Sequence, residues 1–392
     1  MRILVLAHAF PYPPHDGHVG PIYQFLRHLA PRLDLTLLTI RPADEKNWGK
    51  GSGIFADWGI TIRSAPWREV AKPVRALACL RDGRPWPNRF YSPELARLAA
   101  AELARGDYDA VLSWGIMSAQ HLPRSMAIPQ ALMARDCLSL AHRRRFEETR
   151  SPREWLQWRK IRAMERDLFG RADRVFAVSP VDAQAMREIA PGTRVEVLPT
   201  GVDAEAYRPT PEREESGLVL FSGVMDFAPN EDAAVWAARE IWPGVRKARP
   251  DARLVLAGKS PTPRVLELRD IEGVTVTGPV ERMEDEVARA SVVISPLRQG
   301  TGIKNKVMEG AFMAKAMVVT PLSLEGLPLE AGRDCLAESD AEKFAAAVVK
   351  LLGDEGERTR LGQAARQAIA GYDVKTLALR LIPVFEELKK QK

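Results

Sequence analysis

The stretch PLRQGTGIKNKVMEGAFMAKAMVVTP, at residues 296–321, joins a strand pattern to a helix pattern through a loop with few side chains. The strand SVVISP ends where the stretch begins, and residues 303–314 place their apolar side chains at helical spacing. The free amides of a first helical turn and the helix dipole favour an anion. The sequence therefore predicts an anion site at the loop Gly300, Thr301, Gly302 and Ile303.

The charged side chains of the same stretch indicate what the anion belongs to. Arg298, Lys304 and Lys306 lie where a diphosphate would sit, and Glu309 follows one turn along the predicted helix. A single carboxylate holds a vicinal diol, such as that of a ribose, through two hydrogen bonds. The joint interpretation is a nucleoside-diphosphate sugar. The alternative is a surface ion pair between Lys306 and Glu309, which stabilises a helix by only tenths of a kcal/mol.

Strand and helix patterns alternate along the whole chain of 392 residues, and the alternation restarts in the second half. Short, continuously apolar strands between helices are typical of parallel sheets covered on both faces. Two such series predict an α/β protein of two doubly wound domains. We expect the boundary near residues 201–203. The last segment, 373–392, has a helix pattern with Pro383 inside it.

Composition excludes several classes of protein. No window approaches the 18 or so uninterrupted apolar residues of a spanning helix. The three cysteines are odd in number and far apart, which argues against a disulfide framework and for a reducing cytoplasm. The six histidines form no metal motif, so we expect no metal site.

The net charge of +6 is concentrated in residues 143–166, where arginines alternate with Trp155 and Trp158. One interpretation is a solvated helix whose acids, Glu147, Glu148, Glu154 and Glu165, are interleaved with the cations. A second is a face for an anionic membrane, because arginine with tryptophan suits a lipid interface. Nucleic acid is the third, but no nucleic-acid-binding signature supports it.

A glycine-bearing loop, residues 15–20, follows the first strand pattern, RILVLAHAF. Gly17 and Gly20 would let the backbone approach a ligand, and the next helix would direct its amides toward it. The loop lacks the spacing of the dinucleotide fingerprint. A tight turn between strand and helix is the alternative.

The second half also carries a family resemblance. The segments FSGVMDFAPNEDAAVWAAREIWP, PDARLVLAGKSP, GVTVTGPV and ISPLRQGTGIKNKVMEGAFMAKAMVVTPLSLEGL follow one another as in family 4 retaining glycosyltransferases. The sequence PTGVD at 199–203 resembles the family's domain junction, and the GIKNKV element resembles sugar transferases of exopolysaccharide systems. The resemblance covers nearly the whole chain.

The resemblance implies the GT-B fold, in which two Rossmann-like domains face a cleft. Residues 1–201, with the C-terminal helix 373–392, would bind the acceptor, and residues 202–372 would bind the nucleotide sugar. Glu309 matches the acid that binds the donor ribose. The loop from Gly17 to Gly20 matches the donor and acceptor loop. Further donor contacts are expected at Gly223 after the strand LVLFS, and at Gly278 and Val280 beside the base.

Several family positions are occupied differently in this chain. The first acid of the family's E-x7-E motif falls on Thr301, and its arginine and lysine fall near Val224 and Asn230. We therefore expect Arg298 and Lys304, with Lys306 as a third cation, to neutralise the diphosphate. The usual catalytic-site histidine is replaced by Arg135, which cannot act as a base at neutral pH.

Arg135 and the following Asp136 end the strand pattern PQALMARD. Arg135 is suited to a phosphate or a sugar hydroxyl, and Asp136 to orienting an acceptor hydroxyl. A structural pair between the two side chains is the alternative.

The resulting hypothesis is a cytoplasmic, metal-independent retaining glycosyltransferase, peripheral at the inner face of the membrane. It would use a UDP- or GDP-linked sugar as co-substrate, without a cofactor, and a saccharide or lipid-linked acceptor in cell-surface polysaccharide or glycoconjugate synthesis. The alternatives are a non-catalytic protein that binds nucleotide sugars and a sugar-nucleotide epimerase.

Overall fold

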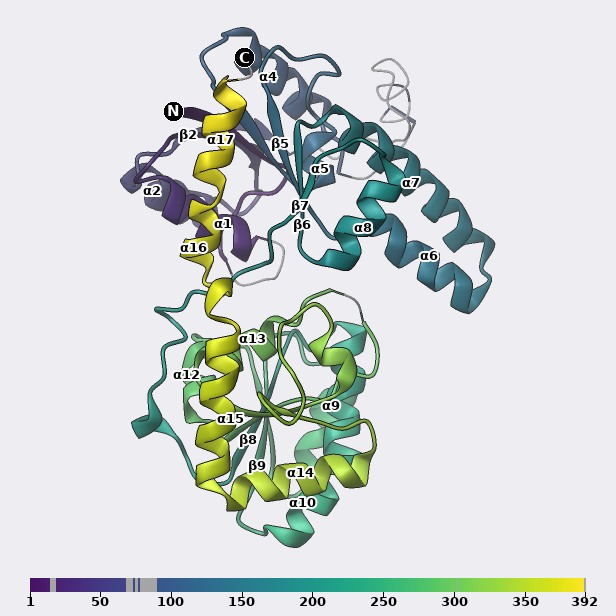
Figure 1. The fold of residues 1–392 in the computed structure, drawn as a ribbon, viewed down its shortest axis with the longest axis vertical. Helices are drawn as coiled ribbons and strands as arrows, with labels where there is room; N and C mark the ends of the chain where they lie inside the picture. Colours follow the sequence, from purple (N-terminus) through teal and green to yellow (C-terminus); the bar gives the residue numbers. More distant parts are fainter. Residues whose placement is uncertain (15–18, 68–72, 75–76, 78–89, 301, 391–392) are drawn as a thin grey trace. The chain divides into compact units, whose positions relative to one another are not determined.

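The computed structural model of the protein describes residues 1–14, 19–67, 73–74, 77, 90–300 and 302–390. The chain forms two compact units, one of Met1–Gly201 with Val374–Lys392 and the other of Val202–Asp373. Each unit is one parallel sheet with helices packed against it (Figure 1). Among the described residues, none of the helices combines the length and apolar character that crossing a membrane requires.

The sheet of the first unit has the strand order β3-β2-β1-β4-β5-β6-β7, and every neighbouring pair is parallel. The strands are β1 Arg2–Ala7, β2 Asp34–Arg41, β3 Thr61–Pro66, β4 Ala110–Trp114, β5 Gln130–Arg135, β6 Arg174–Ala177 and β7 Val195–Val197. The helices are α1 Gly20–Leu29, α2 Glu45–Asp57, α4 Pro93–Ala104, α5 Ile116–Ala119, α6 Leu138–Thr149, α7 Pro152–Arg171, α8 Pro180–Ile189, α16 Val374–Leu379 and α17 Leu381–Lys390.

The second sheet has the order β10-β9-β8-β11-β12-β13 and is also parallel throughout. The strands are β8 Leu218–Ser222, β9 Arg253–Ala257, β10 Val274–Gly278, β11 Val292–Ser295, β12 Ala316–Val319 and β13 Leu336–Ala337. The helices are α9 Ala228–Trp236, α10 Trp242–Ala248, α11 Pro263–Leu266, α12 Met283–Arg289, α13 Asn305–Phe312, α14 Ala341–Gly353 and α15 Glu355–Ala368.

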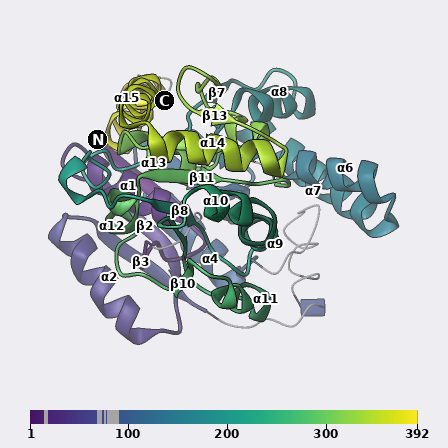
Figure 2. The ribbon, with the colours of Figure 1, turned by 90° about the horizontal axis from the view of Figure 1, so that it is seen from below.

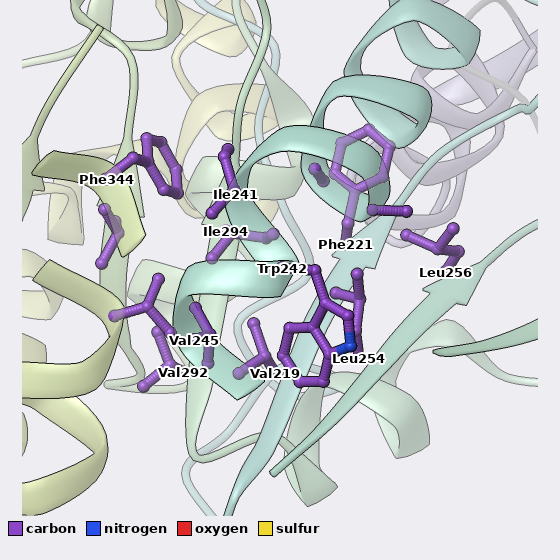
Figure 3. Close-up of a cluster of buried hydrophobic side chains, with 14 of the residues drawn as sticks. Val219, Phe221, Ile241, Trp242, Val245, Leu254, Leu256, Val292, Ile294 and Phe344 are labelled. Atoms are coloured by element: carbon purple, nitrogen blue, oxygen red, sulfur yellow. The ribbon is translucent and has the colours of Figure 1, made fainter. Parts of the chain in front are cut away.

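The core of the second unit shows why its strand patterns are continuously apolar. Strand side chains on one face of the sheet pack against α10 and α14, as Figure 3 shows for Val219 and Leu254 near Trp242 and for Val292 near Val245. The other face packs against α13 and α15, so both faces of the strands are buried. The Trp242 indole N–H is satisfied by the Glu272 carbonyl, 3.0 Å away. Burial on both faces removes the polar alternation that a half-exposed strand would show.

Two segments that have a helix pattern with an internal proline, 232–248 and 373–392, are interrupted in the structure. The pattern at 232–248 becomes α9, a π-helical turn at Ala237–Ile241, and α10, which has Pro243 in its first turn. The single C-terminal helix predicted at 373–392 is instead α16 and α17, with Pro383 in the first turn of α17. A proline has no N–H to donate, so it is tolerated in a first turn, where amides lack an intrahelical partner anyway.

The C-terminal helices pack on the first unit. α16 lies against α1, and Leu377, Leu381 and Phe385 are fully buried in that unit's core. Glu387 of α17 pairs with the buried Arg174 at the start of β6. The end of the chain is therefore part of the first unit's core.

Candidate functional site

In each sheet, the direction in which successive strands are added reverses at one point. We call this point the strand exchange, and in the second unit it lies between β8 and β11. From β8 the chain continues to β9 on one side, and from β11 it continues to β12 on the other. Loops leaving the carboxyl ends of such neighbours diverge and leave room for a ligand. The two loops here are residues 223–227 after β8 and residues 296–304 after β11. They hold most of the residues that the sequence predicts as a donor site.

The loop after β8 lies unusually close to the end of β9. The Gly223 amide donates to the Ala257 carbonyl at 2.9 Å, and a Cβ placed on Gly258 would lie 1.7 Å from the Gly223 carbonyl oxygen. Gly258 has φ +149°, a conformation that favours glycine. Two bare backbones therefore meet beside the strand exchange, where side chains would fill the space.

Helix α13 begins at Asn305, two residues later than predicted, and its N-cap is Lys304. Lysine has no acceptor atom, so the Lys304 side chain cannot cap the first-turn amides as a serine or aspartate would. The Lys304 side chain is buried, with 7% of its surface exposed, and its ammonium donates to the Gly302 carbonyl. This places a positive charge at the positive end of the helix dipole, an arrangement that favours an anionic ligand.

Lys306 extends from α13 toward the end of β8. Its Nζ donates to Oδ1 of Asn230 at 2.7 Å and lies 4.6 Å from the centroid of the Phe221 ring. Burial lowers the pKa of Lys306 to about 7, and Glu309 acts in the opposite direction. Asn230, which the sequence predictions did not name as a site residue, thus connects α9 with α13.

Glu309 lies one turn further along α13, and the Tyr207 side chain lies near its carboxylate. Burial raises the pKa of Glu309 to about 7, although part of the side chain still reaches solvent. Burial and the negative charge of Glu309 together raise the pKa of Tyr207. Tyr207 is a neighbour that no sequence motif marks, because it lies 102 residues before Glu309.

Arg298 is directed onto α9. Its guanidinium makes two hydrogen bonds to the Asp232 carboxylate, at 2.6 and 3.1 Å, and stands 5.2 Å from the centroid of the Trp236 ring. Asp232 raises the pKa of Arg298 and already balances its charge. A role on a phosphate would require Arg298 to exchange this carboxylate for the ligand.

The other predicted donor residues lie around the same edge of the sheet. Gly300, Gly302 and the partly buried Ile303 form the loop before α13, and Gly278 ends β10, where its carbonyl accepts the Gly258 amide at 3.2 Å. Val280 follows two residues later and is half-buried. Thr301 and Gly17 lie outside the described residues.

Arg135 and Asp136 lie at the carboxyl end of β5 in the first unit. Arg135 has φ +67°, and the register between β5 and β6 shifts beside it. A positive φ at a residue other than glycine costs energy and occurs at sites where the backbone re-aims a side chain. Gly20, the other predicted residue of this unit, is the first residue of α1. These residues belong to the first unit and the α13 residues to the second.

The structure corrects the environment that the sequence predicts for Glu165. Glu165 is not a solvated acid but a fully buried one, and its Oε1 accepts the Ser139 amide at 3.2 Å, at the start of α6. Burial raises the pKa of Glu165 to about 7. The sequence feature that could have indicated its burial is its place in the apolar row of α7, between Met164 and Leu168.

Comparisons with known proteins agree with this architecture. A family model described as Glycosyltransferase Family 4 matches residues 22–206, and one described as Glycosyl transferases group 1 matches residues 216–354. No protein in the curated set that was compared matches the chain.

Solved structures share the fold at low identity. HepE (Alr3699) of Anabaena, in complex with UDP and glucose, is 14% identical, with a TM-score of 0.69 over 99% of this chain and 100% of that one. Sucrose-phosphate synthase of Thermosynechococcus elongatus is 14% identical, with a TM-score of 0.70 over 100% and 99%. WaaG, a glycosyltransferase involved in lipopolysaccharide biosynthesis, is 14% identical, with a TM-score of 0.62 over 98% and 99%.

Two Rossmann-like units with parallel sheets and surrounding helices match the GT-B fold, and the predicted fold class is confirmed. The two family models together cover most of the chain. The chain belongs to glycosyltransferase family 4.

Proposed function

We propose that the protein is a metal-independent retaining glycosyltransferase that moves a sugar from a UDP- or GDP-sugar to an acceptor hydroxyl. The observation that carries the proposal is the grouping of the α13 N-terminus, Lys304, Lys306 and Glu309 at the strand exchange of the second unit. In the proposed complex the diphosphate meets the amides and ammonium groups, and the ribose hydroxyls donate to Glu309. The structure of HepE holds UDP and glucose, which supports this donor class.

The proposed chemistry uses the charge that develops on the leaving group. As the bond between the sugar's anomeric carbon and the diphosphate breaks, the electron pair stays on the diphosphate oxygen, which the cations and amides stabilise. The sugar passes through an oxocarbenium-like state, and the acceptor oxygen bonds to the anomeric carbon. Because Arg135 cannot accept a proton, the acceptor's proton passes to the departing diphosphate oxygen. We assign acceptor binding to the first unit, with Asp136 orienting the hydroxyl.

Glu309→Ala is expected to raise the Kd for UDP about 10- to 100-fold, since hydrogen bonds to a charged group contribute about 1.5–3 kcal/mol. Titration calorimetry measures this change. The wild-type affinity is also expected to fall as the pH drops below the Glu309 pKa of about 7, because the protonated carboxyl is a weaker acceptor for ribose hydroxyls. Glu309→Gln should lack this dependence. The exposed Glu355→Gln is the matched control, and an unchanged Kd in Glu309→Ala contradicts the ribose assignment.

A non-catalytic protein that binds nucleotide sugars is the second candidate, favoured by Thr301 and Arg135 at positions where the family carries an acid and a histidine. A panel of UDP- and GDP-sugars distinguishes the two. Transfer or slow hydrolysis of one donor supports the enzyme. Saturable binding with neither reaction supports the non-catalytic protein.

We further propose that the acceptor is a lipid-linked or saccharide group presented at an anionic membrane surface. Helices α6 and α7 lie side by side and extend from the first unit's sheet (Figures 1 and 2). Residues 138–171 contain ten arginines and lysines against five acids, so they supply +5 of the net charge of +6. Trp155 and Leu156 are 40% and 44% exposed on α7, with the Arg159 guanidinium 5.1 Å from the Trp155 ring centroid. Trp158 instead stacks on Phe146 between the two helices.

The double variant Trp155→Ser with Leu156→Ser is expected to bind anionic vesicles about tenfold more weakly, because two apolar side chains no longer enter the interface. Sedimentation with phosphatidylcholine vesicles, with and without phosphatidylglycerol, measures the binding. Val181→Ser on α8, which removes an exposed apolar side chain outside α6 and α7, is the control. Equal vesicle binding by the double variant and the wild type contradicts the proposal.

A further inference from the structure

The ammonium of Lys306 is held by a neutral partner. Its hydrogen-bond acceptor is the Asn230 side-chain oxygen at 2.7 Å, and its other close contact is the Phe221 ring. The charges that act on it are Glu309 and Lys304, both on its own helix or its N-cap. An ammonium has three donors, so the bond to Asn230 leaves donors for a ligand. Arg298, in contrast, is matched by the Asp232 carboxylate.

Two hydrogen bonds and a close contact with the loop after β8 hold Asn230 in place. Its side chain is 8% exposed, its Nδ2 donates to the Val224 carbonyl at 2.9 Å, and its backbone amide donates to the Phe227 carbonyl at 2.8 Å. Because Nδ2 is committed to the Val224 carbonyl, Oδ1 must face Lys306. A Cβ on Gly223 would lie 2.7 Å from that Nδ2, so the side chain also rests against the loop after β8.

These contacts define one position for the ammonium. Asn230 is anchored to the loop after β8, and Lys306 projects from the helix after β11, so their hydrogen bond spans the strand exchange. The neutral Asn230 amide does not cancel the ammonium's charge as a carboxylate would. Burial makes the charged form costly, Glu309 offsets only part of that cost, and an arriving anion would reduce it further.

We propose that Asn230 is a positioning residue, which holds the Lys306 ammonium against the donor diphosphate, and that Lys306 rather than Arg298 is the main cation for donor binding. This inference rests on the proposed function. Asn230 does not touch the diphosphate itself. It selects the direction of the lysine side chain and leaves the charge of that side chain uncancelled.

Calorimetry with UDP on the full chain tests whether Lys306 is the main cation for donor binding. Lys306→Met, which keeps the apolar stem, is expected to bind UDP at least about tenfold more weakly, in the range of a charge-assisted hydrogen bond. Arg298→Met should lose less, and the exposed Lys343→Met on α14 should match the wild type. Wild-type binding above the Lys306 pKa of about 7 should take up a proton, detected with buffers of different ionisation heat, and Lys306→Met should not.

Asn230→Asp tests the positioning role. The carboxylate would pair with Lys306 and raise its pKa. The alkaline limit of UDP binding, meaning the pH above which the affinity falls as Lys306 loses its proton, should therefore move to higher pH. The affinity at neutral pH should fall about tenfold. A role confined to holding the loop would change thermal stability without moving that limit. The double variant with Lys306→Met should show no shift, because the titrating group is gone.

The outcomes distinguish the role of Lys306 from the proposed function. UDP affinity in Lys306→Met equal to that of the wild type, with the larger loss in Arg298→Met, overturns the inference and leaves the donor site in place. Failure of wild-type protein to bind either UDP or GDP overturns the proposed function and this inference with it. If Asn230→Asp does not fold, proton uptake by the wild type and its loss in Lys306→Met still decide the role of Lys306, and Asn230→Ser, which shortens the side chain, then decides that of Asn230.

Discussion

Gly258→Ala is expected to destabilise the second unit by about 2–6 kcal/mol, the sum of about 1–3 for a strained backbone and about 1–3 for overpacking. The new Cβ would lie 1.7 Å from the Gly223 carbonyl oxygen, closer than two atoms can approach, so the ends of β8 and β9 must separate. The φ of +149° adds strain for any side chain. A loss of this size is a large part of a domain's usual stability of about 5–15 kcal/mol.

Two other glycines provide graded controls for this measurement by thermal or urea unfolding. Gly278 has φ +71°, but the space that a Cβ would occupy is open, so its alanine variant should show the cost of backbone strain alone, about 1–3 kcal/mol. Gly353 ends α14 with neither constraint and should change little. Unfolding of Gly258→Ala at the same midpoint as Gly353→Ala contradicts the close approach of the two loops.

The fold was predictable because parallel strands buried on both faces leave a simple signature. Strands such as β8, β11 and β12 read as short apolar runs that end in glycine or proline, and their alternation with helices determines the class. The β3 strand was missed because an exposed threonine and arginine and a half-buried serine interrupt its pattern, and β13 because it has only two residues. The proline breaks in 232–248 and 373–392 depend on which turn the proline occupies, which periodicity does not reveal.

The grouping of the candidate-site residues around α13 was predictable, but the directions of their side chains were not. The loop before α13 follows from the sequence because glycines and a helix start are local features. The partners of Arg298 and Lys306 come from α9, more than 60 residues away in the sequence, and only packing brings Asp232 and Asn230 to them. Tyr207 reaches Glu309 in the same way. Local patterns therefore assigned cations to the site without showing which of them a carboxylate already neutralises.

Lys304→Ala is expected to lower kcat about 100- to 1,000-fold, by analogy with removal of one donor that stabilises developing negative charge. The Lys304 ammonium lies in the loop before α13 and adds its charge to the amides of the first turn. The diphosphate gains charge as the glycosidic bond breaks, so this interaction strengthens toward the transition state and should appear in kcat more than in the Kd for UDP. Single-turnover transfer with the donor identified from the sugar-nucleotide panel measures it.

The burial of Lys304 requires controls for folding, since only 7% of its surface is exposed. Lys304→Met retains the apolar stem and should keep the unfolding temperature near that of the wild type while losing activity as Lys304→Ala does. Lys304→Arg retains the charge and should recover part of kcat. Activity within about twofold of the wild type in Lys304→Met would exclude this ammonium from the stabilisation of the leaving diphosphate, because a charge that matters in the transition state contributes more than that factor.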